Sequence, residues 1–131
     1  MIYNIEISFS SLHSNMLSTL IKNTAYEYHC VKFNQDFEMD IERNKCVLHI
    51  QFDIKEGTIS YLLSFIKIIK KIPDIHIETV YTDTSPEIQL LYASSYYLTT
   101  IDKHIAFLYK TNRKKRIYSD DEYKIIDLFK K

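Results

Sequence analysis

Two neighbouring stretches of alternating apolar and polar residues are the clearest pattern in the chain. From Val31 to Ile41 every second residue is apolar except Gln35, and the residues between them are polar and mostly acidic. The alternation resumes from Cys46 to Ile54. Successive side chains of a strand point to opposite faces of a sheet, so this pattern predicts a two-strand hairpin over residues 31–54 with one apolar and one polar face.

Similar patterns predict the elements on either side of the hairpin. They give a strand over 2–9, a helix over about 12–28, a helix over 58–72 that Pro73 ends, and a strand over 75–82. The buried stripe of the first helix is expected to contain Leu12, Met16, Leu17, Leu20, Ile21 and Ala25. In the strand over 75–82, Ile75, Ile77, Thr79 and Tyr81 are expected to share one face.

This order of elements, β-α-β-β-α-β, is that of ferredoxin-like folds. We therefore expect a single α+β domain over 1–131, with an antiparallel sheet, both helices on one face and the other face open. The chain is long enough to bury a core of its own, and it has 46% hydrophobic residues.

The last third of the chain is expected to add about two helices. Ser85, Pro86 and Glu87 have the composition of a helix start, and the apolar spacing after them predicts a helix over 87–100. Residues 104–110 fit either a fifth strand or more helix. Ser119 and Glu122 have the spacing of a capping box, which predicts a terminal helix.

Charge adds a candidate binding surface to this fold. Seventeen basic and seventeen acidic residues cancel over the whole chain, which disfavours a general polyanion binder. The predicted open face nevertheless collects carboxylates, and its predicted partner-binding residues are Asp36, Glu38, Asp40, Glu42, Glu6 and Glu78. Such a face attracts cationic proteins, and its central positions lack the stacking aromatics of an RNA-recognition module.

A non-catalytic binding role follows from these features. The chain has no G-x-S-x-G or phosphate-loop motif, its single glycine excludes glycine-built phosphate loops, and we expect no enzymatic activity and no cofactor. In type, a compact chain with an acidic surface resembles bacterial toxin-immunity proteins, which neutralise basic nuclease toxins by electrostatic docking. The best prediction is thus an immunity or inhibitor protein whose partner is a cationic protein.

Two alternatives remain open at this point. The first is nucleic-acid binding or regulation through a predicted basic loop formed by Arg113, Lys114, Lys115 and Arg116. The second is a metal-dependent enzyme, because histidine and carboxylate side chains suit zinc binding or proton transfer. Its residues would come from the predicted sheet face and are His49, His76, Glu6, Glu78 and Asp53.

The remaining signals concern the compartment and the assembly. Cys30 and Cys46 have no metal-ligand spacing, and Cys46 lies on the apolar face of its strand, so a buried reduced thiol is expected. No signal peptide and no apolar run of membrane-spanning length is visible, so we expect a cytoplasmic protein that does not enter a membrane. It is expected to be a monomer or a homodimer built through the open sheet face.

Overall fold

The computed structural model describes residues 1–10, 14–34, 45–55, 58–84, 87–100, 103–115 and 118–130. It is an α+β structure with a five-stranded antiparallel sheet. In chain order the elements are β1 (Ile2–Ser10), α1 (Ser14–Glu27), β2 (Lys32–Asn34), β3 (Lys45–Asp53), α2 (Ile59–Lys70), β4 (Ile75–Thr84), β5 (Glu87–Ala93), α3 (Ser95–Thr100), α4 (Lys103–Lys115) and α5 (Asp120–Asp127).

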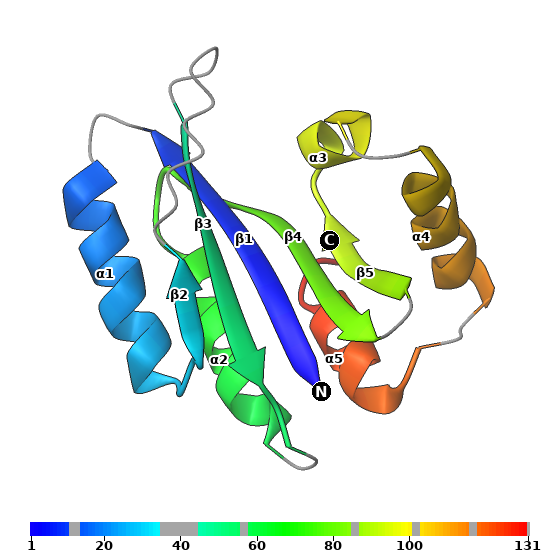
Figure 1. Cartoon of the computed structure of the whole chain (residues 1–131), viewed down its shortest axis with the longest axis horizontal. Coiled ribbons are helices and arrows are strands. Elements are labelled where there is room, and N and C mark those ends of the chain that lie inside the picture. The colour runs from blue at the N-terminus through cyan, green and yellow to red at the C-terminus, as the bar shows by residue number, and fades with distance from the viewer. Residues whose placement is uncertain are drawn as a thin grey trace.

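The sheet is built around its first strand. The strand order is β2-β3-β1-β4-β5, so β1 lies in the centre (Figure 1). Ile5 of β1 lies opposite Ile50 of β3 on one side and opposite Val80 of β4 on the other. The alternation predicted for β1 is confirmed, because Tyr3, Ile5, Ile7 and Phe9 are all buried in the main core.

One face of the sheet carries this main core together with α1, α2 and α5. Ile21 of α1, Ile66 of α2 and Ile125 of α5 are all fully buried there or nearly so. The rings of Phe52 on β3 and Phe65 on α2 pack with their centroids 5.0 Å apart. The predicted stripe of α1 is wider than the observed one, because Met16 and Leu20 are 66% and 45% exposed.

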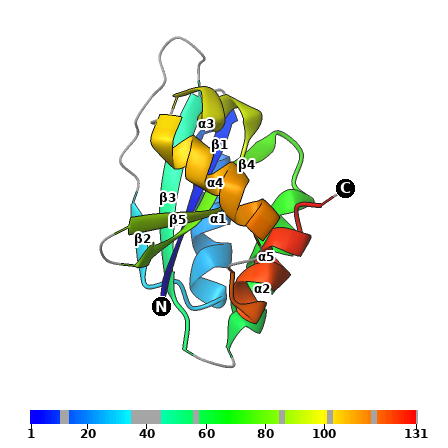
Figure 2. The ribbon, with the colours of Figure 1, turned by 90° about the vertical axis from the view of Figure 1, so that its right-hand side faces the viewer.

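On the second face of the sheet, α3 and α4 cover the side formed by β4 and β5. Leu90, Ala93 and Tyr109 form a separate buried cluster, against which Tyr81, Tyr97, Leu98 and Ile105 pack. Figure 1 shows α4 on the β5 side of the molecule, away from α1, and Figure 2 shows it in front of β5. The expectation of an entirely open second face is therefore wrong over β4 and β5.

Residues 87–100 differ most from the prediction, because a strand and a short helix replace the expected single helix. Leu90 is buried in the second cluster, and its neighbour Leu91 is buried in the main core. A strand covered on both faces carries a continuous apolar run, which periodicity cannot distinguish from a helix. The fifth strand thus lies at Glu87–Ala93, and residues 104–110 belong to α4.

The predicted alternation of β4 holds only for its first half. The pairing of β1 with β4 shifts between Glu6 and Ile7, which leaves Glu78 as an extra residue on β4. After this β-bulge, Val80 is buried in the main core and Tyr81 packs against the second cluster. The bulge exchanges the two faces of the strand, so Thr79 and Tyr81 do not share the face of Ile75 and Ile77.

Two smaller predictions are confirmed. The capping box of α5 is present, with the Ser119 hydroxyl accepting from the Glu122 N–H and the Glu122 carboxylate accepting from the Ser119 N–H. Cys30 and Cys46 are buried and unbonded to each other.

The hairpin is described only from its two ends, since residues 35–44 lie outside the described part of the chain.

Candidate functional site

The predicted acidic surface is divided between described and undescribed residues. Four of its members, Asp36, Glu38, Asp40 and Glu42, lie outside the described residues. Glu6 and Glu78 are described, but only Glu6 retains appreciable exposure. In the alternative basic site, Arg113, Lys114 and Lys115 fall in the last turn of α4 instead of a loop, and Arg116 lies outside the described residues.

A polar network occupies the middle of the second face. Asn4 of β1 is only 2% exposed, and its Oδ1 accepts hydrogen bonds from Nε2 of His49 at 2.8 Å and from Nε2 of Gln51 at 2.9 Å. Because an amide oxygen can only accept, Nε2 of His49 carries the hydrogen. The Tyr81 hydroxyl lies 3.4 Å from the same nitrogen, and the Tyr81 and His49 rings are stacked.

The surroundings of His49 favour its neutral form. Burial lowers the pKa of His49, and the positive charge of Lys32 on β2 lowers it further. Both effects penalise the imidazolium, while the hydrogen bond to Asn4 is satisfied by the neutral tautomer. His49 is therefore a neutral member of a structural hydrogen-bond network at neutral pH.

The described part of the second face is balanced in charge. Lys32 lies opposite Gln51 and Lys45 lies opposite Ser10, so both share the face of Glu6 and Asp53. On β1, β2 and β3, the two exposed or half-exposed carboxylates of this face are matched by two lysines. An acidic character of this surface thus depends on residues 35–44, which contain four acids and one base.

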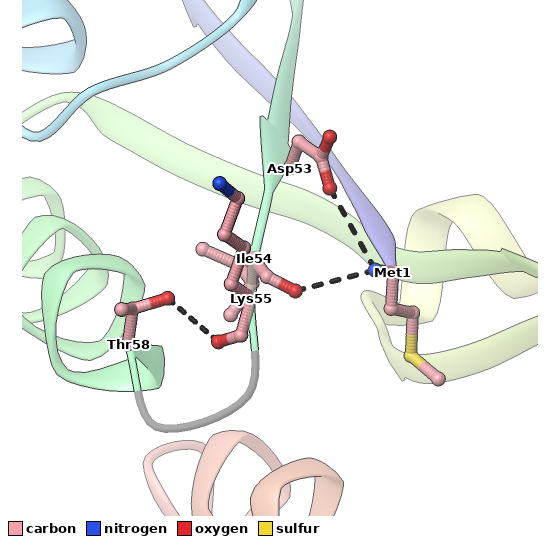
Figure 3. A network of polar contacts seen from close by, with 5 residues as sticks. All are labelled: Met1, Asp53, Ile54, Lys55 and Thr58. Carbon is pink, nitrogen blue, oxygen red and sulfur yellow. Dashed lines mark hydrogen bonds and ion pairs between the residues drawn. The ribbon is translucent and has the colours of Figure 1, made fainter.

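Asp53 lies at one end of the sheet, in contacts that Figure 3 shows. Its Oδ1 is 3.7 Å from the amino nitrogen of Met1, which donates a hydrogen bond to the Ile54 carbonyl at 3.2 Å. Nearby, the Thr58 hydroxyl donates to the Lys55 carbonyl at 2.7 Å. These contacts tie the end of β3 to the start of β1 and to the beginning of α2.

The residues of the predicted metal site do not all converge, although Glu6 lies opposite His49. Asp53 pairs with Ile2, whereas His76 pairs with Ser8, six residues further along β1. At about 3.3 Å per residue, these two positions are about 20 Å apart. Among the described residues, no group of three or more His, Cys, Asp or Glu side chains could hold a metal ion.

Glu78 is held inside the structure by the bulge. It is 6% exposed, and its two carboxylate oxygens accept hydrogen bonds from the Ser8 hydroxyl at 2.7 Å and the Ser94 hydroxyl at 2.5 Å. The Ser94 hydroxyl also accepts from the Tyr97 N–H at 3.1 Å, which caps the first turn of α3. The contacts of Glu78 are those of a structural carboxylate, and its predicted role in partner binding stays a prediction.

Glu78 also lines a cavity of about 380 Å³ at the opposite end of the sheet from Asp53. The cavity is lined by Lys45, Lys70, Ile75, His76, Ile77, Glu78, Tyr92, Ser94 and Phe129. The rings of Tyr92 and Phe129 stack with centroids 3.9 Å apart. The Lys70 ammonium lies 5.1 Å from the Phe129 centroid and donates to the Leu128 carbonyl, so it also caps the end of α5.

Sequence reasoning did not bring these cavity residues together. Lys45, Lys70 and Tyr92 come from three different elements, Ser94 lies between β5 and α3, and the four form no motif in the chain. The only local signal is at Ser94, a residue type that often caps a helix and that precedes α3 directly. Their convergence depends on strand register and on the two irregular pairings of β4.

Comparison with known proteins gives no assignment. No protein-family model matches the chain, and no curated protein sequence or solved structure matches it. In the part of the chain that the structure describes, no helix combines the length and apolar character needed to cross a bilayer.

Proposed function

We propose that this protein is a non-catalytic binding protein that captures a cationic protein, in the manner of a toxin-immunity protein. The proposed surface is the acidic connection over residues 35–44 with the adjoining second face of β2, β3 and β1. The observation that carries the proposal is that α3 and α4, the described helices on this face, lie over its β4 and β5 side. No described helix lies over β2 and β3 on this face, and these are the two strands that residues 35–44 connect.

Charge supports this choice of surface. Residues 35–44 have a net charge of −3, from four acids and one base, in a chain whose net charge is zero. A concentrated charge of one sign accelerates association with a partner of opposite sign and makes that association sensitive to salt. Glu6 would extend the acidic surface onto β1. Glu78 is buried, so it would contribute indirectly, by holding β4 in position.

Charge reversal tests the proposed surface. The immobilised chain is exposed to a lysate of its native host at low salt, and bound protein is eluted with about 0.5 M salt, at which surface electrostatics are strongly screened. A captured protein is then purified and titrated against the wild type and the Glu38→Lys/Asp40→Lys variant by calorimetry. We expect a basic partner whose affinity falls at least about tenfold in the variant.

The matched control is Glu27→Lys, which reverses an exposed acid on α1, away from the proposed surface. The control is expected to keep the wild-type affinity. A partner that binds the Glu38→Lys/Asp40→Lys variant as tightly as the wild type contradicts the proposed surface. If the purified partner is a nuclease, inhibition of its activity by the wild type tests the immunity role directly.

We also infer a ferredoxin-like arrangement for the first four strands. In the order β2-β3-β1-β4, β3 lies between β1 and β2, which α1 connects, and β1 lies between β3 and β4, which α2 connects. Each of these is a β-α-β unit split by an inserted strand, which supports the inference. β5 is then an addition outside β4.

A second candidate function is nucleic-acid binding through α4. This helix has five basic residues (Lys103, Lys110, Arg113, Lys114 and Lys115) and no acidic one, although the chain as a whole is neutral. Phe107, on the same helix, is 63% exposed. A basic helix with an exposed aromatic ring can contact phosphates and stack on an unpaired base.

An electrophoretic mobility shift with short single-stranded and double-stranded RNA and DNA tests this second candidate. Loss of the shift in Arg113→Ala/Lys114→Ala, with retention in the control Lys22→Ala on α1, would support it. The shift should also weaken steeply with salt. An equal shift in both variants would contradict a role for α4.

A further inference from the structure

The cavity at the end of β4 lies against an edge of the sheet instead of on a face. Its lining includes the four consecutive residues of β4 from Ile75 to Glu78. Side chains of a strand alternate between its faces, so a cavity on one face would contact only every second residue. Contact with all four indicates that the cavity opens onto the backbone edge.

The edge is exposed there because β5 stops before β4 does. The pairing of the two strands ends with Thr79 opposite Ala93, and the Ser94 N–H then donates to the Glu78 carbonyl at 2.8 Å. Among the described strands, none pairs with residues 75–77 on this side. Alternate residues of a strand direct their N–H and C=O groups to each edge, so this stretch presents pairing groups to the cavity.

The walls of the cavity differ on the two sides of this edge. On the side of the main core, Ile75 and Ile77 adjoin the stacked rings of Tyr92 and Phe129. On the other side lie Lys45 and the exposed His76, which are on the same face of the sheet as their partners Ser10 and Ser8. An extended segment placed here would direct one set of alternate side chains to apolar walls and the other to basic groups.

Among the described lining residues, Glu78 is the acidic one, and it is hydrogen-bonded within the fold. Both oxygens of Glu78 accept hydroxyl hydrogen bonds, from Ser8 and from Ser94. These neutral donors leave the charge of Glu78 in place, so the described lining carries two lysine charges against one carboxylate charge, and this net positive charge favours carboxylates.

We propose that this edge binds an extended acidic peptide by strand addition. The peptide continues the line of β5, pairs its backbone with β4 at residues 75–77, and alternates apolar with acidic side chains. Backbone pairing supplies affinity in such complexes, and the two walls supply specificity. The described lining residues are not among residues 35–44, and the site selects a charge of opposite sign, so its test does not depend on the function proposed above.

Titration of the ¹⁵N-labelled full chain with the capped peptide Val-Glu-Val-Glu-Val, followed by amide NMR, tests the proposal. We expect shifts at the amides of Ile75–Glu78 and Ser94, with a dissociation constant of about 1 mM, as befits a short unoptimised peptide. Lys45→Gln should weaken binding several-fold, whereas the control Lys55→Gln, at the opposite end of β3, should not. The amide spectrum of each variant reports whether it is folded.

Three further probes distinguish strand addition from other causes of the amide shifts, even if a variant does not fold. The same peptide with its central backbone nitrogen methylated, and the peptide Val-Lys-Val-Lys-Val, should bind at least about tenfold more weakly. Free glutamate should leave these amides unshifted at the same concentration. Binding of the methylated peptide, equal binding of the lysine peptide, or the same shifts with glutamate would each overturn the proposal, as would absence of any shift with the acidic peptide.

Discussion

The hydrogen bonds that hold Glu78 can be tested by replacing Ser8 with alanine. Ser8 is 1% exposed, and its hydroxyl donates to one oxygen of the Glu78 carboxylate. The substitution removes a single oxygen atom, so it creates almost no strain and only a small cavity. Its main effect is to leave one oxygen of a buried carboxylate without its donor.

The size of the effect follows from the charge and burial of Glu78. A hydrogen bond to a charged group contributes about 1.5–3 kcal/mol to stability, and water does not readily replace the lost donor at a position that is 6% exposed. We therefore expect Ser8→Ala to lower the free energy of unfolding by about 2 kcal/mol. With a urea m-value of about 2 kcal/mol per molar, the midpoint of unfolding falls by about 1 M.

Urea unfolding followed by far-ultraviolet circular dichroism measures this loss, since the chain has no tryptophan. The control Ser60→Ala removes an exposed hydroxyl from α2 and should change stability by less than about 0.5 kcal/mol. A double-mutant cycle with Glu78→Ala, which removes the acceptor, isolates the pair. If Ser8→Ala costs no more than the control, or if the cycle shows no coupling, then Ser8 does not stabilise the buried carboxylate.

Three other substitutions test separate features. Because the folded state lowers the pKa of His49, the contribution of His49 to stability is present above about pH 6.5 and is lost as the pH falls further. In urea unfolding, His49→Gln should reduce this loss of stability, whereas the exposed control His104→Gln should not. Ser119→Ala should cost about 1 kcal/mol in the same assay by removing the cap of α5, and no loss would contradict the capping role. Burial and the charges of Glu122 and Asp121 raise the pKa of Tyr3 to about 12, so Tyr3→Phe should remove tyrosinate absorbance only from the last part of an alkaline titration.

The sequence predicted those elements that have one apolar and one polar face. β1 and β3 alternate cleanly because only one of their faces meets the main core, and α2 has a matching stripe. Residues 87–93 were misread because Leu90 and Leu91 are both buried, on opposite faces. A local window shows the apolar run but not the second layer that covers it, and α4 supplies that layer from further along the chain.

The site was less predictable than the fold, because it depends on register. The position of Glu78 in an apparently regular strand indicated an exposed side chain, and the bulge that turns it toward Ser8 leaves no recognisable mark in the sequence. The cavity requires in addition that β5 end opposite Thr79. Neither fact follows from composition or spacing, because both are set by how non-neighbouring strands fit together.

The central place of β1 has a consequence for the order in which the protein can fold during synthesis. Ile5 is translated before both of its partners, Ile50 and Val80, which are separated from it by 45 and 75 residues. Long-range pairing of this kind slows folding, because a large loop must close before any contact is gained. On the ribosome, β1 emerges before β3 and β4 and exposes its apolar side chains until they follow, which makes it a segment that a nascent-chain chaperone can bind.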